Sequence, residues 1–184
     1  PFVCGSAGRV LPDFEVCIQD DAGRPLPIGQ TGEICVRGPS MMLGYWRNEQ
    51  ATAEAIIDGW LHSGDIGHLD ERGYLYITDR KKDLIIKGGE NISPREIEEA
   101  LQRLPGVAEV AAFGVPDPVL QEDIAVAIVR ASQPPLTAPQ VQEFAAAQLS
   151  KFKVPRYVAF AEQLPKNSNG KVLKRSLRDQ WKHT

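Results

Sequence analysis

The sequence has few of the features that mark a secreted or membrane protein. Only three cysteines occur in 184 residues, Cys4, Cys17 and Cys35, and neither their number nor their spacing suits a disulfide framework. No apolar run approaches the roughly 18 residues that span a bilayer. The start at Pro1 is not a charged leader, and it suggests a piece of a longer chain. We therefore expect a cytoplasmic protein in a reducing compartment, with no membrane span.

Several common kinds of active site are also missing. The histidines His62, His68 and His183 have no partners at zinc-ligand spacing, so we predict no metal site in this chain. No serine lies in a nucleophile-elbow setting, and the Walker phosphate-loop spacing is absent. Any chemistry must therefore come from other residues.

Charge is small overall but unevenly distributed. The formal net charge is −3, which predicts neither nucleic acid nor a membrane surface as partner. Residues 150–184, however, hold nine Lys and Arg against Glu162 and Asp179. Either a solvated surface or a site for an anionic ligand with several phosphates accounts for this basic segment. Cys17 and Cys35 lie in alternating apolar runs, where a core position is expected.

The first eighty residues read as short strands broken by turns, with one helix. Strands are expected at 15–18 and 33–37. Asn48 is a suitable N-cap for a helix to about Ile57, which Asp58-Gly59 would end. Strands at 65–69 and 74–78 flank a four-residue turn and predict a hairpin.

The second half alternates strands with helices. After a strand at 84–86, a helix begins with Ser93 as N-cap, Pro94 at N1 and Glu96 at N3, which form a capping box. This helix should run to about Arg103. The remaining expected elements are strands at 107–115, 124–129 and 157–160, loops at 116–118 and 133–135, a helix from Thr137 to about Leu149 that repeats the capping box with Gln140, and a short basic terminal helix. This order predicts a small sheet with helices packed on it.

A charged run, Asp79-Arg80-Lys81-Lys82-Asp83, separates the two halves. Five successive charged residues between two strand signals are typical of an exposed connection, so the domain boundary is predicted there, giving 1–80 and 81–184.

Three short motifs can each be interpreted either as part of a ligand site or as ordinary local structure without a function. The carboxylate of Asp65, after Ser63-Gly64, can accept both hydroxyls of a ribose, but Gly-Asp turns are common. Adjacent Gly88-Gly89 allow the close approach of a thin ligand arm, or form a simple tight turn. The loop 165–171 presents Lys171, which either reaches a developing charge on phosphate or is a solvated surface lysine.

Taken together and in order, these motifs resemble the adenylate-forming superfamily of acyl-CoA synthetases, luciferases and peptide-synthetase adenylation domains. The resemblance covers essentially the whole chain, and Gly88-Gly89-Glu90-Asn91-Ile92 looks most like the acyl- and aryl-CoA synthetases. The matching segments are Gly32 to Gly38 with Gly44-Tyr45-Trp46, Ser63-Gly64-Asp65, Asp79 to Asp83, Gly88 to Pro94 with Glu96-Ile97-Glu98, and Pro165-Lys166 through Gly170-Lys171.

The resemblance implies an α/β (α+β) fold: a β-rich end of the large AMP-binding domain over 1–80, then the small, mobile, mixed-sheet C-terminal domain over 81–184. It implies that a carboxylic acid and Mg²⁺-ATP give acyl-AMP and that CoA then displaces AMP, while the small domain rotates between the two steps. The implied roles are ribose binding by Asp65, nucleotide contact by Arg80, the hinge at Lys82, passage of the CoA arm at Gly88 and Gly89, and adenylation by Lys171.

Some family features differ or lie elsewhere. Ser63 and Asn167 stand where threonine is common, and Gln121 stands where the family often has glycine. The phosphate loop and the acid pocket lie upstream of residue 1 in the family, so the chain alone is expected to be inactive and to need the N-terminal domain of the same polypeptide. A peptide-synthetase adenylation domain and a non-catalytic nucleotide- or CoA-binding module are the alternatives.

Overall fold

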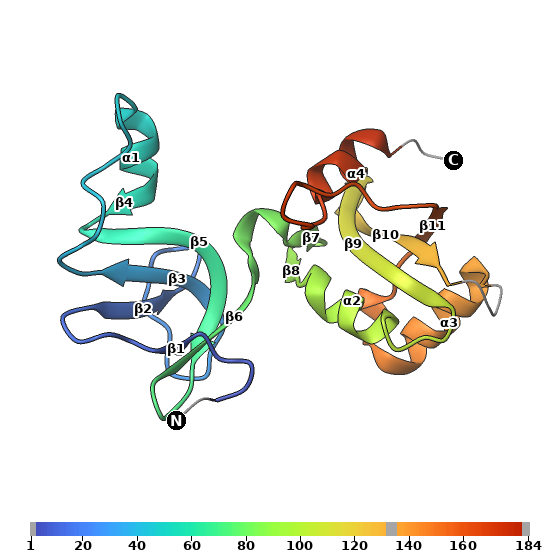
Figure 1. Ribbon diagram of the computed structural model, residues 1–184, viewed down its shortest axis with the longest axis horizontal. Coiled ribbons are helices and arrows are strands. Elements are labelled where there is room, and N and C mark those ends of the chain that lie inside the picture. Colours follow the sequence, from blue (N-terminus) through green and yellow to red (C-terminus); the bar gives the residue numbers. More distant parts are fainter. Residues whose placement is uncertain (1–2, 132–135, 182–184) are drawn as a thin grey trace. The chain divides into compact units, whose positions relative to one another are not determined.

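The computed structural model describes residues 3–131 and 136–181, and it divides into two compact units, 1–82 and 83–184 (Figure 1). The assignment of these units to functional domains stays a prediction. The loop expected at 133–135 and His183 lie outside the described residues. Within those residues, no helix is long and apolar enough to cross a membrane.

The first unit is built on an antiparallel sheet. The strand order is β1-β6-β5-β3-β2, and β4 pairs with β5 at its edge. Ile18, Ile34 and Tyr74 are buried hydrophobic residues of this unit. The strand bounds are Gly8–Arg9 for β1, Glu15–Gln19 for β2, Gly32–Arg37 for β3, Ile56–Ile57 for β4, Trp60–Leu69 for β5 and Tyr74–Arg80 for β6.

Helix α1, Glu49–Ala55, starts where the sequence predicts and ends earlier. The Asn48 side chain caps it by accepting a hydrogen bond from the Ala51 amide at 3.0 Å. Ile56 and Ile57 leave the helix and form β4, which pairs with the start of β5. Asp58 and Gly59 both adopt positive φ, the backbone of a two-residue hairpin turn, and β-branched isoleucine favours the strand.

The hairpin between β5 and β6 is confirmed, with both strands longer than expected. Its turn is fixed by Asp70, whose Oδ1 accepts hydrogen bonds from the Arg72 and Tyr74 amides at 2.9 and 2.8 Å. Cys35 is fully buried and Cys17 half-buried on the neighbouring strands β3 and β2, and burial raises the pKa of the Cys35 thiol to about 12. A thiol that stays protonated is a poor nucleophile, which suits a packing role.

The second unit contains the mixed sheet that the sequence led us to expect. Strand β10 lies between β9, which is antiparallel to it, and β11, which is parallel, and β7 meets it at Gln121. The chain order is β7 Ile85–Lys87, β8 Glu90–Ile92, α2 Pro94–Leu101, β9 Val107–Asp117, β10 Gln121–Arg130, α3 Ala138–Gln148, β11 Tyr157–Ala161 and α4 Lys174–Gln180.

Both faces of this sheet are buried, which explains the nearly continuous apolar runs of β9 and β10. One face packs against α2 and α3 and the other against α4 (Figure 1). The first core contains Ile97, Ile124 and Val141, and the second contains Phe113 and Leu164. The alternation of strand residues between the two cores follows the period of two of an extended chain.

The predicted caps of α2 and α3 are present. Ser93 Oγ accepts a hydrogen bond from the Glu96 amide at 3.3 Å, and the Thr137 amide donates to Gln140 Oε1 at 3.0 Å. The Glu96 carboxylate binds Lys153 Nζ at 2.6 Å, a tertiary contact that the cap pattern does not predict. Helix α2 ends at Leu101, two residues before the expected end.

Two connections in this unit differ from the expectation. The segment from the first strand to Ser93 was expected as a turn alone, but it contains β8, which pairs with β7. Pro116 and Asp117 were expected in a loop, but they belong to β9, and the connection to β10 is a tight turn at 118–120. Asp117 shapes that turn, because its Oδ1 accepts hydrogen bonds from the Val119 and Leu120 amides, both at 2.9 Å.

Gln121 has a φ of +71°, which accounts for the glycine that is common at this position in the resembling family. A left-handed backbone costs an L-residue about 1–2 kcal/mol, and the Gln121 side chain is exposed. We predict that relief of this strain in Gln121→Gly raises the free energy of unfolding by about 1 kcal/mol. The larger backbone entropy that glycine loses on folding offsets part of this gain. Thermal unfolding of the full-length protein measures this. Gln121→Ala retains the strain, so an equal gain from alanine would contradict the explanation.

Candidate active site

The structure brings Asp65 and Arg80 together on neighbouring strands of the first unit. They are register partners on β5 and β6, and Arg80 Nε lies 2.6 Å from Asp65 Oδ1. Both side chains are reached by solvent, at 24% exposure for Asp65 and 48% for Arg80. A carboxylate has about four acceptor positions, so Asp65 keeps acceptors for hydroxyl groups while it binds the guanidinium.

The backbone beside Asp65 is set by Ser63 and Gly64. Ser63 Oγ donates to the Ile34 carbonyl at 2.7 Å and accepts from the Asp65 amide at 3.1 Å. Threonine would offer the same hydroxyl, so serine preserves the turn. Gly64 has a φ of +71°, a conformation that glycine adopts without strain.

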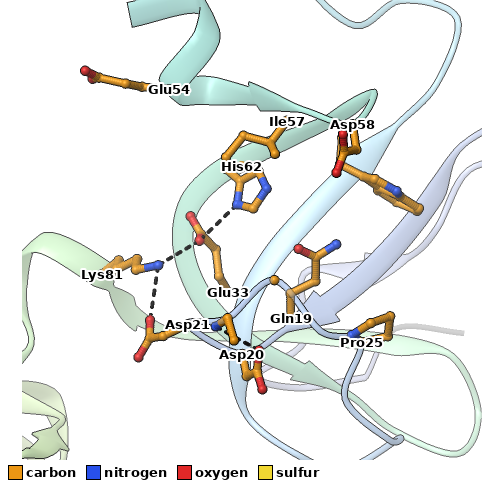
Figure 2. Close-up of a pocket in the computed structure, with 13 residues that line it drawn as sticks. Gln19, Asp20, Asp21, Pro25, Glu33, Glu54, Ile57, Asp58, His62 and Lys81 are labelled. Atoms are coloured by element: carbon orange, nitrogen blue, oxygen red, sulfur yellow. Dashed lines mark hydrogen bonds and ion pairs between the residues drawn. The ribbon is translucent and has the colours of Figure 1, made fainter.

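The first unit also has a polar hollow of about 640 Å³, whose lining includes Lys81, the residue after Arg80 (Figure 2). Glu33 is buried at its base and contacts His62 and Lys81, with distances of 3.1 Å to His62 Nδ1 and 3.0 Å to Lys81 Nζ. Lys81 Nζ also lies 3.2 Å from Asp21 Oδ1. Sequence reasoning singled out Lys81 only as part of a charged run and missed Glu33 and His62. The one available signal was a carboxylate inside an otherwise apolar strand.

Gly88 and Gly89 form the two-residue turn between β7 and β8, both at positive φ. The Gly88 amide donates to the Leu120 carbonyl at 2.8 Å, so the turn is attached to the β9–β10 connection. A Cβ on Gly88 would lie 3.1 Å from the Phe152 ring, whereas a Cβ on Gly89 would meet nothing within 4 Å. Gly89 therefore leaves open space along the turn, which suits a thin ligand.

A buried ion pair supports this turn from below. Lys87 Nζ lies 2.7 Å from Asp123 Oδ1, and both side chains are less than a tenth exposed. Arg156 Nη1 links Asp123 to Asp117, at 3.4 and 3.1 Å. The Lys87–Asp123 pair thus ties the end of β7, just before the Gly88-Gly89 turn, to β10.

Lys171 stands at the end of a loop that Asn167 organises. Asn167 Oδ1 accepts hydrogen bonds from the amides of Asn169 and Lys171, at 3.0 and 2.9 Å. Asparagine thus supplies the acceptor that a threonine hydroxyl would offer more weakly. Lys171 is exposed, and its ammonium makes no ion pair within the described part of the chain. This lysine is therefore available to an anionic ligand.

Lys82 is the middle residue of a short 3₁₀ turn, Lys81–Asp83, and the last residue of the first unit. Its side chain is exposed. The turn joins β6, which carries Arg80, to β7, which leads into the Gly88-Gly89 turn.

The basic segment is partly neutralised by carboxylates from elsewhere in its unit. Its lysines and arginines form salt bridges with acids on α2, β9 and β10. Four of these salt bridges are Lys153–Glu96, Arg156–Asp117, Lys166–Glu109 and Lys174–Glu98. Four of the nine cations are thus bound by acids elsewhere in the unit, and Lys171 is not among them.

Known proteins match along nearly the whole chain. The profile of the family described as AMP-binding enzyme matches residues 2–46, and that of the AMP-binding enzyme C-terminal domain matches residues 96–171. A long-chain-fatty-acid–CoA ligase of Escherichia coli is 47% identical over 96% of this chain and 31% of its own length. The ligase FadD13 of Mycobacterium tuberculosis is 43% identical over 98% of this chain and 35% of its own.

The same similarity extends to solved structures. ATP-bound MatB from Rhodopseudomonas palustris superposes with a TM-score of 0.89 at 40% identity, over 95% of this chain and 35% of MatB. The chain belongs to the adenylate-forming superfamily of AMP-binding enzymes, as a part of such an enzyme. It spans about a third of the length of the curated relatives it matches.

Proposed function

We propose that this chain is the C-terminal part of an ATP-dependent, AMP-forming acyl-CoA synthetase. The observation that carries the proposal is the extent of similarity to CoA ligases: up to 47% identity over 96% of the chain, across both units. The two implied steps are attack of a carboxylate on the α-phosphate of Mg²⁺-ATP, which releases pyrophosphate, and attack of the CoA thiol on acyl-AMP, which releases AMP. The cytoplasm is the proposed location.

The residues divide between these steps by their surroundings. Asp65 offers acceptors to the ribose hydroxyls, and Arg80 pairs with the Asp65 carboxylate and lies beside the nucleotide. Lys171 brings an ammonium that has no ion pair within the described residues to the charge that develops on carboxylate and phosphate oxygens. Gly88 and Gly89 give the pantetheine arm of CoA a path without side chains, and the Lys87–Asp123 pair beneath them keeps that path in place.

The test is an assay of the full-length enzyme with fatty, aryl and short carboxylic acids. We expect AMP and an acyl-CoA thioester to form together from at least one class of acid. AMP binding without any turnover would favour a non-catalytic module. Acyl transfer to a carrier domain, but not to free CoA, would favour a peptide-synthetase adenylation domain.

We predict that residues 1–184 expressed alone form no acyl-AMP. In the resembling family, the phosphate loop and the acid pocket belong to the part of the enzyme before this chain, and Asp65 and Lys171 cannot replace them. Exchange of labelled pyrophosphate into ATP, dependent on added carboxylate, measures the first step. Exchange catalysed by the purified chain would show that this division of the site is wrong.

A further inference from the structure

Glu33 is a buried carboxylate to which the proposed roles assign nothing. Its side chain is 9% exposed on β3, which lies between β5 and β2 in the sheet of the first unit. Each of its oxygens is used: Oε1 accepts a hydrogen bond from the Gly64 amide at 3.3 Å, and Oε2 contacts His62 Nδ1 and Lys81 Nζ at 3.1 and 3.0 Å. Figure 2 shows His62 and Lys81 pointing at this carboxylate.

Two of these partners, Gly64 and Lys81, are neighbours in the chain of Asp65 and Arg80, the two residues proposed to bind the nucleotide. Gly64 immediately precedes Asp65 on β5, and Lys81 immediately follows Arg80 at the end of β6. Both contacts come from one side chain on a third strand, so a shift of either strand end would break a bond to Glu33. The register shift between Ile66 and Gly67 lies just beyond this point, which leaves the ends of β5 and β6 with less regular pairing.

We propose that Glu33 is a positioning residue for the nucleotide site: by binding Gly64 and Lys81 together, its carboxylate holds Asp65 and Arg80 at the spacing that a ribose requires. This inference rests on the proposed function, because it assumes that Asp65 and Arg80 bind the nucleotide. The contact between Glu33 and Lys81 would also hold the chain on the first unit as far as residue 81, so that the hinge begins at Lys82.

The electrostatics of the cluster agree with this role. Burial by itself would raise the pKa of the Glu33 carboxyl, but hydrogen bonds from His62 and Lys81 outweigh burial, and the pKa lies below its ordinary value. Burial likewise opposes charge on Lys81, while bonds to Glu33 and Asp21 raise the pKa of its ammonium. Both groups are therefore charged at neutral pH, and the contact is a charge-assisted hydrogen bond.

The test measures AMP affinity and half-reaction kinetics in the full-length enzyme. Glu33→Gln keeps the shape of the side chain and removes its charge. Lys81→Met keeps the stem of the half-exposed lysine and removes its ammonium, which makes misfolding less of a concern. Lys81→Arg is the conservative rescue. Glu15→Gln is the matched control, because Glu15 is an exposed carboxylate on the neighbouring strand and pairs only with Arg37 among its described neighbours.

Glu33→Gln and Lys81→Met should each weaken AMP binding, measured by calorimetry, roughly tenfold, the effect of one lost charge-assisted hydrogen bond. The KM values for ATP and for preformed acyl-AMP should rise to a similar extent, whereas the KM for CoA stays near that of the wild type. Lys81→Arg should recover most of the AMP affinity, and Glu15→Gln should leave it unchanged.

A lower thermal midpoint with unchanged AMP affinity would make Glu33 a residue of folding only and overturn the proposal. An equal rise in the KM for CoA would overturn it too, because the effect would then not be confined to the nucleotide. Failure of the proposed function looks different: the wild type would form no acyl-AMP from any acid, while the calorimetric comparison of the variants would still decide the role of Glu33.

Discussion

In the full-length enzyme, Lys171→Ala is expected to slow formation of acyl-AMP by roughly 10²–10³, the range for losing one transition-state donor. The alanine removes an exposed ammonium that makes no ion pair within the described residues, so the loop itself should keep its shape through Asn167. Thioester formation started from preformed acyl-AMP and CoA should change much less. Rapid-quench measurement of the two half-reactions separates these effects.

The matched control is Lys166→Ala, which removes a lysine of the same loop that is paired with Glu109. We expect both half-reactions of this variant to stay close to the wild type, because an exposed ion pair contributes little to stability. Equal losses in the two half-reactions of Lys171→Ala would instead mean that Lys171 maintains the structure of the loop.

The second large effect is expected at Lys82. A rotation between two units must be absorbed by a few backbone angles, and proline fixes φ near −65°. Proline also restricts the residue before it, here Lys81, so Lys82→Pro limits the backbone conformations open to the turn Lys81–Asp83. We predict that adenylation survives within about tenfold, whereas thioester formation is strongly suppressed.

Lys82→Ala is the control, because it removes the ammonium and leaves the backbone free. It should be mild in both half-reactions. A proline variant that completes the whole reaction at the wild-type rate would place the hinge elsewhere, and the predicted boundary near residue 80 would lose its functional support.

Local signals in the sequence predict local structure well in this chain. Asn48, Ser93 and Thr137 mark the starts of α1, α2 and α3, because a cap depends on residues within one helical turn. Helix ends were less accurate. Ile56 and Ile57 continue the apolar pattern of a helix, yet pairing with β5 draws them into a strand, and this tertiary gain overrides local preference.

The candidate site was predictable only in part, for a related reason. The short motifs around Asp65, Gly88 and Lys171 are contiguous, so resemblance to a family finds them. The contact of Glu33 with Lys81 joins residues 48 positions apart in the chain. No spacing rule connects two such residues, and their proximity follows from the strand order of the sheet, which the sequence pattern did not predict.

The ion pairs of the basic segment bear on how fast anionic substrates arrive. Long-range attraction depends on net charge in a region of space, and here lysines and arginines that cluster in sequence are dispersed among carboxylates of the same unit. We therefore expect the unit 83–184 to exert little electrostatic steering on the proposed substrates ATP and CoA. In the proposed enzyme, recognition of their phosphates by this unit should depend on contacts at close range, which salt screens less than a distant field.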